Sequence, residues 1–139
     1  MMRMTCRAIA GCLLMLTLAT SGAAAAAQLA GSEWRPTEIG GVEVPAGSDL
    51  FVRFGGEGKL RGHGGCNGFF GTYRLAGDGI EIGKLGATRM ACAEPVMARE
   101  ALFLQALAKA RQFARDRIDL LLTDGAGNPV VRLIQTDAD

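Results

Sequence analysis

The sequence predicts an α+β fold that is mainly β, in which an antiparallel sheet curls into a partial barrel and one helix packs against it. Three observations predict this fold. Short segments of alternating apolar and polar residues recur along the chain, glycine-rich turns separate these segments, and one stretch, residues 95–110, has helical periodicity. The sequence contains no internal repeat and no change of composition that would mark a second folded domain.

Residues 1–27 have the layout of a secretory signal peptide, which we expect to be removed. Arg3 and Arg7 make a basic start without acidic residues, an apolar segment follows over residues 9–18, and small residues close the region. The apolar segment is shorter than the about 20 residues that a transmembrane helix needs. The mature chain is therefore expected to comprise residues 28–139, to lack a transmembrane segment, and to be periplasmic or secreted.

Lipid anchoring at Cys12 is a less favoured alternative. The stretch Ile9–Cys12 has the look of a lipobox. A lipobox closes the apolar segment, however, and here most of the apolar residues follow the cysteine.

The charge balance argues against nucleic acid as a partner. The whole chain has 15 basic and 14 acidic residues, and two of the basic residues leave with the signal peptide. A protein that binds phosphate backbones needs a basic surface, which this nearly neutral domain does not provide. We expect a monomer.

The first half of the mature chain predicts four strands. Leu29–Ile39 is the first, and because Pro36 cannot donate a backbone hydrogen bond, we expect this strand at an edge of the sheet. Gly40 and Gly41 predict a hairpin turn. The other strands are predicted at Val42–Val44, Leu50–Phe54 and Lys59–His63.

The centre of the chain is the stretch Gly62–Tyr73. Glycine tolerates positive φ, so Gly64–Gly68 predicts a kinked turn that carries Cys66. Asn67 is suited to the same kind of backbone conformation. After the turn, apolar residues alternate in a pattern that predicts a strand over Phe69–Leu75.

The second half predicts one helix among short strands. Pro95 suits the first turn of a helix, and an apolar face continues to about Ala110. Glycine-rich turns are predicted at Ala76–Gly79 and Asp124–Asn128, and the polar tail Gln135–Asp139 is expected to be disordered. Strands are predicted at Ile80–Ile82, within Leu85–Met90, from Phe113 with Ile118–Leu122, and at Pro129–Ile134.

Cys66 and Cys92 are the two cysteines that remain in the mature chain. An even pair in an exported domain predicts a disulfide. Two buried free thiols are the alternative, because the distance between the residues cannot be read from the sequence. A zinc site that includes His63 lacks a fourth ligand at a matching spacing, and a Cys66 nucleophile with His63 as base lacks an orienting third group. We therefore predict no metal, no cofactor and no catalytic residue.

Glu100 lies on the apolar face of the predicted helix, where a carboxylate must be paired or hydrogen-bonded. We hypothesise a structural role for it. Its carboxylate would accept hydrogen bonds from the backbone of the central turn, from Asn67, or from Thr88 or Arg89. A catalytic acid is disfavoured because no second carboxylate is placed beside Glu100.

These motifs together resemble the META domain family, which includes the bacterial heat-shock protein HslJ. The resemblance lies in Gly65–Tyr73, in Thr88–Cys92 and in Glu100 of the helix. Leu29–Trp34 is similar to the Leu-x-Gly-x-x-Trp start of the family, and Leu120–Arg132 is similar to its apolar ending, so nearly the whole mature chain is covered in order. The motif residues that we assign structural roles are Gly65, Asn67, Gly68, Gly71, Tyr73, Thr88, Met90 and Glu100.

The resemblance implies an exported or membrane-associated protein with a β-rich fold. It also implies links to heat shock, to resistance to the aminocoumarin novobiocin, and to secretion or motility. The family supplies no catalytic residue to transfer, so we do not expect an enzyme.

Two functional classes follow. The first is a non-catalytic envelope protein that acts through contacts with other envelope components, under stress conditions. The second is a small carrier that holds an apolar ligand inside a partial barrel. A short chain has little apolar wall to spare for an empty pocket, so the first class is favoured. The candidate lining residues of the carrier are Phe51, Phe54, Phe69, Phe70 and Phe103.

Overall fold

The computed structural model describes residues 29–137. The predicted signal peptide and the candidate lipobox lie outside these residues. The elements in chain order are β1 (Ser32–Ile39), β2 (Val42–Glu43), β3 (Phe51–Phe54), a short 3₁₀ turn (Gly56–Gly58), β4 (Lys59–His63), β5 (Gly68–Ala76), β6 (Gly79–Ile82), β7 (Gly86–Ala87), α2 (Glu94–Lys109), β8 (Gln112–Asp116), β9 (Asp119–Thr123) and β10 (Pro129–Gln135).

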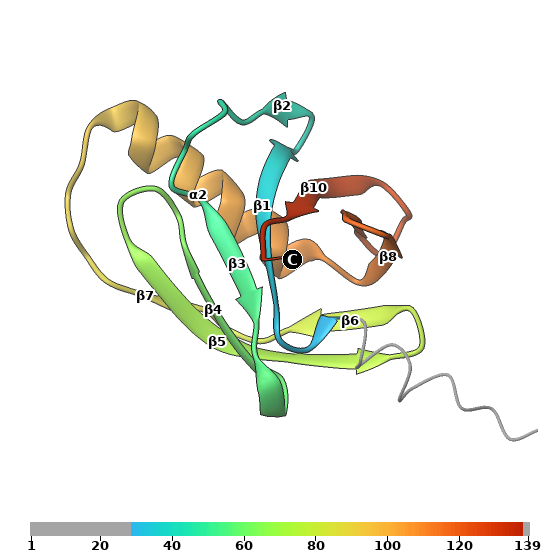
Figure 1. The fold of residues 1–139 in the computed structure, drawn as a ribbon. Coiled ribbons are helices and arrows are strands. Elements are labelled where there is room, and N and C mark those ends of the chain that lie inside the picture. The colour runs from blue at the N-terminus through green and yellow to red at the C-terminus, as the bar shows by residue number, and fades with distance from the viewer. Residues whose placement is uncertain (1–28, 138–139) are drawn as a thin grey trace, which may run out of the picture.

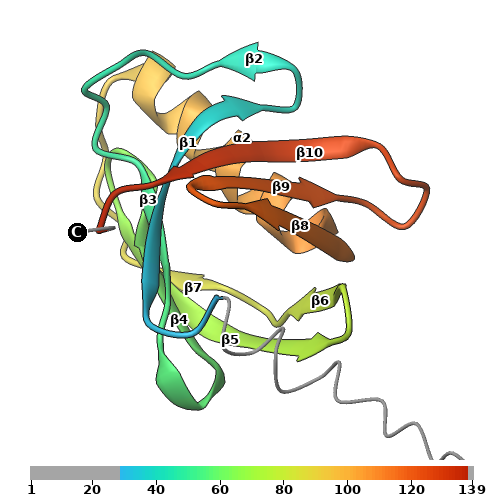
Figure 2. The same ribbon diagram turned by 45° about the vertical axis from the view of Figure 1, so that its right-hand side comes forward.

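The sheet closes on itself into an antiparallel barrel (Figures 1 and 2). The order of neighbours is β10, β9, β8, β6, β5, β4, β3 and β1, and β1 pairs in turn with β10, which gives a closed ring of eight strands. The short strands β2 and β7 pair with β1 and β5 beside this ring. The predicted fold class is confirmed, and the predicted partial barrel is in fact closed.

The helix α2 packs against β10, β1 and β6. It follows the long loop after β7 and runs across the barrel toward β8 (Figure 1). Its buried residues include Glu100, Phe103 and Leu107, so one face of the helix adds to the core. The ring of Phe103 packs edge-on against Phe69 of β5, with the ring centroids 5.7 Å apart. This contact joins the helix to the strand that follows the central turn.

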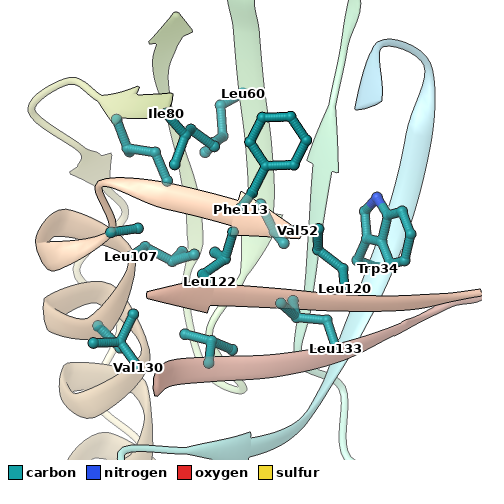
Figure 3. Close-up of a cluster of buried hydrophobic side chains, with 14 of the residues drawn as sticks. Trp34, Val52, Leu60, Ile80, Leu107, Phe113, Leu120, Leu122, Val130 and Leu133 are labelled. Carbon is teal, nitrogen blue, oxygen red and sulfur yellow. The ribbon is translucent and has the colours of Figure 1, made fainter. Parts of the chain in front are cut away.

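Apolar side chains from all the ring strands fill the barrel (Figure 3). Trp34, Phe54 and Phe103 are fully buried there. The indole N–H of Trp34 donates to the Ser32 hydroxyl at 2.7 Å, and the Arg115 guanidinium lies 5.0 Å from the centroid of the same ring. A tryptophan is thereby buried with its one polar group satisfied.

The expectation that the first strand lies at an edge is wrong. β1 pairs with β3 through Ser32–Trp34 and with β10 along most of its length. Pro36 is tolerated because the register with β10 shifts between Pro36 and Glu38, and the pairing with β3 has already ended at Trp34. A bulge is one of the places where a sheet accepts proline.

The strand β8 was not predicted. The sequence indicated one strand from Phe113 with Ile118–Leu122, whereas the structure has a hairpin in which Phe113 lies on β8 and residues 119–123 form β9. Its turn contains Arg117, which has a φ of 57°. Because no glycine or asparagine marks this turn, the sequence gives no local signal for it.

The polar tail is ordered at least to Asp137, contrary to expectation. The backbone N–H of Glu33 donates to Asp137 Oδ1 at 3.0 Å, and the backbone N–H of Thr136 donates to the Glu33 carbonyl at 3.1 Å. Arg53 lies 3.6 Å from the Asp137 carboxylate. These contacts fix the end of β10 against the start of β1.

Candidate functional site

The site is built on the tight turn between β4 and β5. Gly65 has a φ of 110°, which side chains rarely adopt, and the Gly64 N–H donates to the Asn67 carbonyl at 2.9 Å. The Gly65 N–H donates to Nδ1 of His63 at 3.1 Å. The turn thus presents the backbone N–H groups of Cys66 and Asn67 to the helix.

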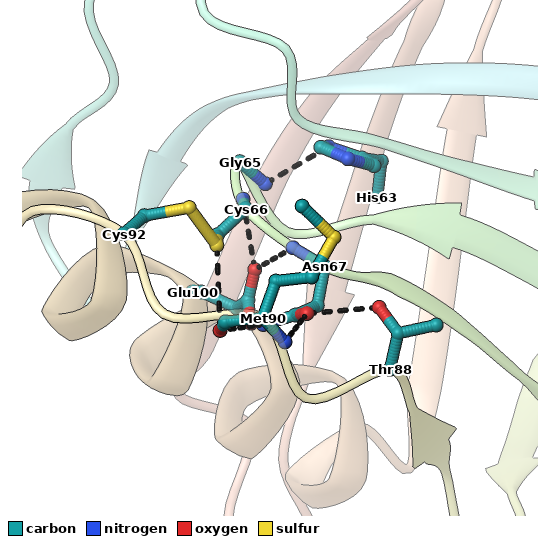
Figure 4. Close-up of a disulfide and its surroundings, with 8 residues drawn as sticks. All are labelled: His63, Gly65, Cys66, Asn67, Thr88, Met90, Cys92 and Glu100. Atoms are coloured by element: carbon teal, nitrogen blue, oxygen red, sulfur yellow. Dashed lines mark hydrogen bonds between the residues drawn. A yellow bond between two sulfur atoms is a disulfide. The ribbon is translucent and has the colours of Figure 1, made fainter.

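Cys66 and Cys92 form a disulfide, with Cα atoms 6.0 Å apart (Figure 4). The predicted pairing is confirmed. The bond attaches the segment before α2 to the central turn. It also removes the two thiols that the zinc and nucleophile alternatives need. Within residues 29–137, no group of three or more His, Cys, Asp or Glu side chains is placed to hold a metal ion.

Glu100 of α2 points at the turn and is only 5% exposed. Its Oε2 accepts the backbone N–H groups of Cys66 at 3.0 Å and of Asn67 at 2.6 Å, and its Oε1 accepts the Asn67 side-chain amide at 2.7 Å. The turn backbone and Asn67 are two of the partners predicted for Glu100 from the sequence. Thr88 bonds to Asn67 instead, and Arg89 is exposed.

The environment of Glu100 acts on its pKa in two opposite directions. Burial raises the pKa of this carboxyl group, and the hydrogen bonds from Asn67 and Cys66, with a smaller contribution from His63, more than reverse that effect. The net result is a pKa below the ordinary value. Glu100 is therefore held as a charged acceptor inside the domain.

The side chain of Asn67 connects the three parts of the site (Figure 4). Its Oδ1 accepts the Thr88 hydroxyl at 2.8 Å and the Met90 N–H at 2.7 Å. Its Nδ2 donates to Glu100 and, at 3.2 Å, to the Met90 carbonyl. Turn, loop and helix are thereby held by one buried amide. The expectation that Asn67 is present for a positive φ is wrong, because only Glu57 and Arg117 have positive φ among the described non-glycine residues.

Close packing explains two glycines of this region. A Cβ atom on Gly64 would lie 2.4 Å from Cγ of Glu100, so only glycine lets the turn approach the helix this closely. A Cβ atom on Gly71 would lie 2.8 Å from Cδ2 of Leu85. Gly71 was among the motif residues assigned structural roles, whereas Gly64 was predicted only as the start of the kinked turn.

The other motif residues hold the surroundings of the site. The Gly68 carbonyl accepts the Thr88 N–H at 3.0 Å. The Tyr73 hydroxyl donates to the Gly55 carbonyl at 2.6 Å, and burial raises the pKa of this phenol.

Met90 contributes its backbone, while its side chain is 61% exposed. His63 is half-buried, and its support of the turn was not predicted from the sequence.

The hydrogen bonds of Glu100 and Asn67 stabilise the local structure of the turn, the loop and the helix. Glu100 and Asn67 bond to each other and to the backbone around them. In the described part of the chain, every buried side-chain nitrogen and oxygen has a hydrogen-bond partner. A carboxylate used in this way fixes the turn between β4 and β5, the loop before α2, and α2 itself in one position.

The fold and the site define a small disulfide-linked β-barrel domain in which a helix carboxylate holds a glycine-rich turn. The chain belongs to the META domain family, whose domain matches residues 27–137. The resemblance stated from the motifs is confirmed. A comparison with functionally curated proteins found no match.

Solved structures with similar folds include an NMR structure of a protein from Burkholderia xenovorans, with a TM-score of 0.65 and 23% identity over 83% of this chain and 88% of that one. A second NMR structure has a TM-score of 0.62 and 21% identity, covering 78% and 92%. A crystal structure of a DUF4847 family protein from Bacteroides vulgatus has a TM-score of 0.50 and 19% identity, covering 66% and 62%. At these identities the similarity shows the fold alone.

Proposed function

We propose that this protein is a non-catalytic component of the cell envelope that is exported, oxidised at Cys66 and Cys92, and active through contacts with other envelope components. The observation that carries the proposal is the disulfide, because such bonds persist in oxidising compartments outside the cytoplasm. The signal-peptide layout of residues 1–27 supports the same location. No helix among the described residues is both long enough and apolar enough to cross a bilayer.

A non-catalytic role is supported by how the polar groups of the motif are used. Glu100 receives three hydrogen bonds from Cys66 and Asn67. An acid or base in a reaction needs a proton path to a substrate, and this carboxylate instead faces the turn that it holds.

The test is the intact mass of the protein isolated from its native compartment, with thiol alkylation before and after reduction. We expect a mass that starts at Gln28 and alkylation of Cys66 and Cys92 only after reduction. Alkylation without reduction would contradict the oxidised state. Retention of residues 1–27 would contradict export, and a chain that starts at an acylated Cys12 would place the protein on a membrane surface.

We propose, from the family resemblance alone, a contribution to tolerance of heat and of novobiocin-type aminocoumarins. The test compares a deletion strain with a strain complemented by the wild-type gene, with survival after heat shock and the inhibitory concentration of novobiocin as readouts. We expect both to fall on deletion and to recover on complementation. Unchanged values in the deletion strain would contradict this role.

The alternative, a carrier with an apolar ligand inside the barrel, is less well supported. Phe54, Phe69 and Phe103 are buried in the packed core, whereas Phe51 is half-buried and Phe70 is 61% exposed. The five candidate lining residues therefore do not surround one interior space.

A further inference from the structure

A shallow groove lies on the outside of the barrel, over β3, β4 and β5. Its volume is about 430 Å³, within the range of about 300–1,000 Å³ that is usual for small-molecule sites. Phe51 of β3, Arg61 of β4, Phe70 of β5 and Thr88 line it, and Arg61 is the direct cross-strand neighbour of Phe70. The backbone around Gly68, two residues before Phe70 on β5, forms part of the floor.

Two glycines give the groove its shape. Gly68 pairs with His63 across β4 and β5, and because it has no side chain, the floor beside His63 is open. Gly86 of β7 pairs with Phe70, and a Cβ atom there would lie 2.8 Å from Cζ of the Phe70 ring. The Phe70 ring therefore rests on Gly86, away from β4, and leaves the floor at Gly68 uncovered.

The two sides of the groove are aromatic. Phe51 stacks on the imidazole of His63 with an interplanar angle of 12° and a centroid distance of 6.4 Å, which holds its ring in place. Phe70 lies two strands away from Phe51 and is offset along the sheet, because Phe51 is level with Gly68 whereas Phe70 is level with Arg61. The surface over Gly68 is therefore bordered by Phe70 on the same strand and by the stacked rings of His63 and Phe51 across the sheet, which leaves room for a flat ring system on Gly68.

One cation at the groove has no carboxylate partner. Arg61 is exposed and forms no ion pair with any residue in the range 29–137. Its cationic neighbours differ in this respect: Arg53 is paired with Asp137, and Lys59 with Glu57. The groove therefore combines aromatic walls with one uncompensated positive charge, a combination that favours an anionic ligand with an aromatic ring.

We propose that this groove is a binding site for a small planar aromatic anion, such as an aromatic carboxylate. The ring lies over Gly68 and against Phe70, with Phe51 at the far edge of the groove, and the anionic group bonds to the Arg61 guanidinium. The proposal goes beyond the envelope function and does not depend on it.

The test uses 2-naphthoate as the probe and 2-naphthalenemethanol as its uncharged match. Each is titrated into the ¹⁵N-labelled protein produced from the full-length gene, and amide chemical shifts are followed by NMR. We expect naphthoate to shift the amides of Gly68, Phe70 and Thr88 in a saturable manner. The alcohol is expected to bind about two- to five-fold more weakly, as an exposed charge pair allows.

Three variants locate the site. A Cβ atom on Gly68 meets nothing closer than 3.8 Å and φ there is ordinary, so Gly68→Val fills the groove without straining the fold and is expected to abolish the shifts. Arg61→Gln is expected to remove the preference for naphthoate over the alcohol, and Phe70→Ser to weaken both probes. Lys59→Gln, on the same strand as Arg61, and Val42→Ser, at another exposed apolar residue, are controls that should bind like the wild type.

The proposal is overturned by any of three results. These are an absence of saturable shifts at the groove, shifts that persist in Gly68→Val, or equal binding of the two probes by the wild type. Because Gly68→Val is expected to keep its melting temperature, loss of binding with an unchanged melting temperature identifies the groove rather than the fold as the cause.

Discussion

Glu100 is the residue on which the site depends most. It is 5% exposed and accepts hydrogen bonds from three donors, so its removal leaves those donors without a partner inside the domain. We expect Glu100→Gln to lower the free energy of unfolding by about 1–3 kcal/mol, because one amide N–H then faces a donor. Glu100→Ala should cost more, since all three donors lose their acceptor. Urea denaturation measures both.

Glu94→Gln is the matched control for these variants. Glu94 is exposed in the first turn of the same helix, where its interaction with the helix dipole contributes less than about 1 kcal/mol. If both Glu100 variants unfold at the wild-type urea concentration, the structural role is wrong.

The pKa of Glu100 makes part of the stability depend on pH. Burial raises this pKa, but the hydrogen bonds lower it to below the ordinary value of 4.5. The folded state therefore binds the proton more weakly than the unfolded chain does. The stabilisation is complete above the unfolded pKa and is lost as the pH falls through the folded one.

We expect the free energy of unfolding to decrease below about pH 4.5. The decrease should be smaller in Glu100→Gln, which has no proton to bind at this position. Asp124 and Asp137, whose pKa values are also lowered, remain in both proteins, so the difference between the two pH profiles isolates Glu100. Parallel profiles would contradict the prediction.

For single residues, the sequence predicted hydrogen-bond partners where a polar side chain falls in an apolar environment. A glutamate on an apolar helix face must be satisfied, so the partners of Glu100 could be named in advance. The role of Asn67 could not, because an asparagine beside glycines has an adequate local explanation in the turn. Its contacts with Thr88 and Met90 lie more than 20 residues away along the chain.

At the scale of elements, the turn between β4 and β5 requires glycine at one position and only tolerates it at another. Gly65 has a φ of 110°, whereas Gly68 has ordinary φ and open space around a Cβ atom. We expect Gly65→Ala to destabilise the protein by about 1–3 kcal/mol through backbone strain. Gly68→Ala should change stability by no more than about 1 kcal/mol. Thermal unfolding of the two variants tests this, and equal effects would show that strain at Gly65 is not the cause.

The elements that were predicted correctly have local signals. Pro95 and the apolar face located α2, and the Gly40-Gly41 pair, with φ of 56° and 83°, located the first hairpin. β8 was missed because its turn at Arg117 has no glycine. β1 was misplaced because Pro36 indicates an edge only when no bulge accommodates it.

At the scale of the whole molecule, closure of the barrel depends on β1 and β10, which lie at opposite ends of the described chain. Alternation along a strand shows that one face is buried but does not show which strand lies beside it. The contacts of Asp137 with Glu33 and Arg53 reinforce this closure. Pairing between chain ends is a property of the assembled sheet, so the sequence supported only a partial barrel.

The disulfide is expected to stabilise the whole domain, because it closes a loop between residues 26 positions apart. For a loop of this length the unfolded chain loses conformational freedom equivalent to about 3–4 kcal/mol, a large share of the stability of a small domain. We expect the free energy of unfolding of the double variant Cys66→Ala/Cys92→Ala to be lower by that amount, which urea denaturation measures as a lower transition midpoint. A reductant should shift the wild type in the same direction and leave the double variant unchanged, which separates loss of the bond from loss of the Cys66 side chain. If reduction leaves the wild-type transition where it was, the hydrogen bonds of Glu100 and Asn67 hold the turn without the covalent link, and the main role of the disulfide must be sought outside equilibrium stability.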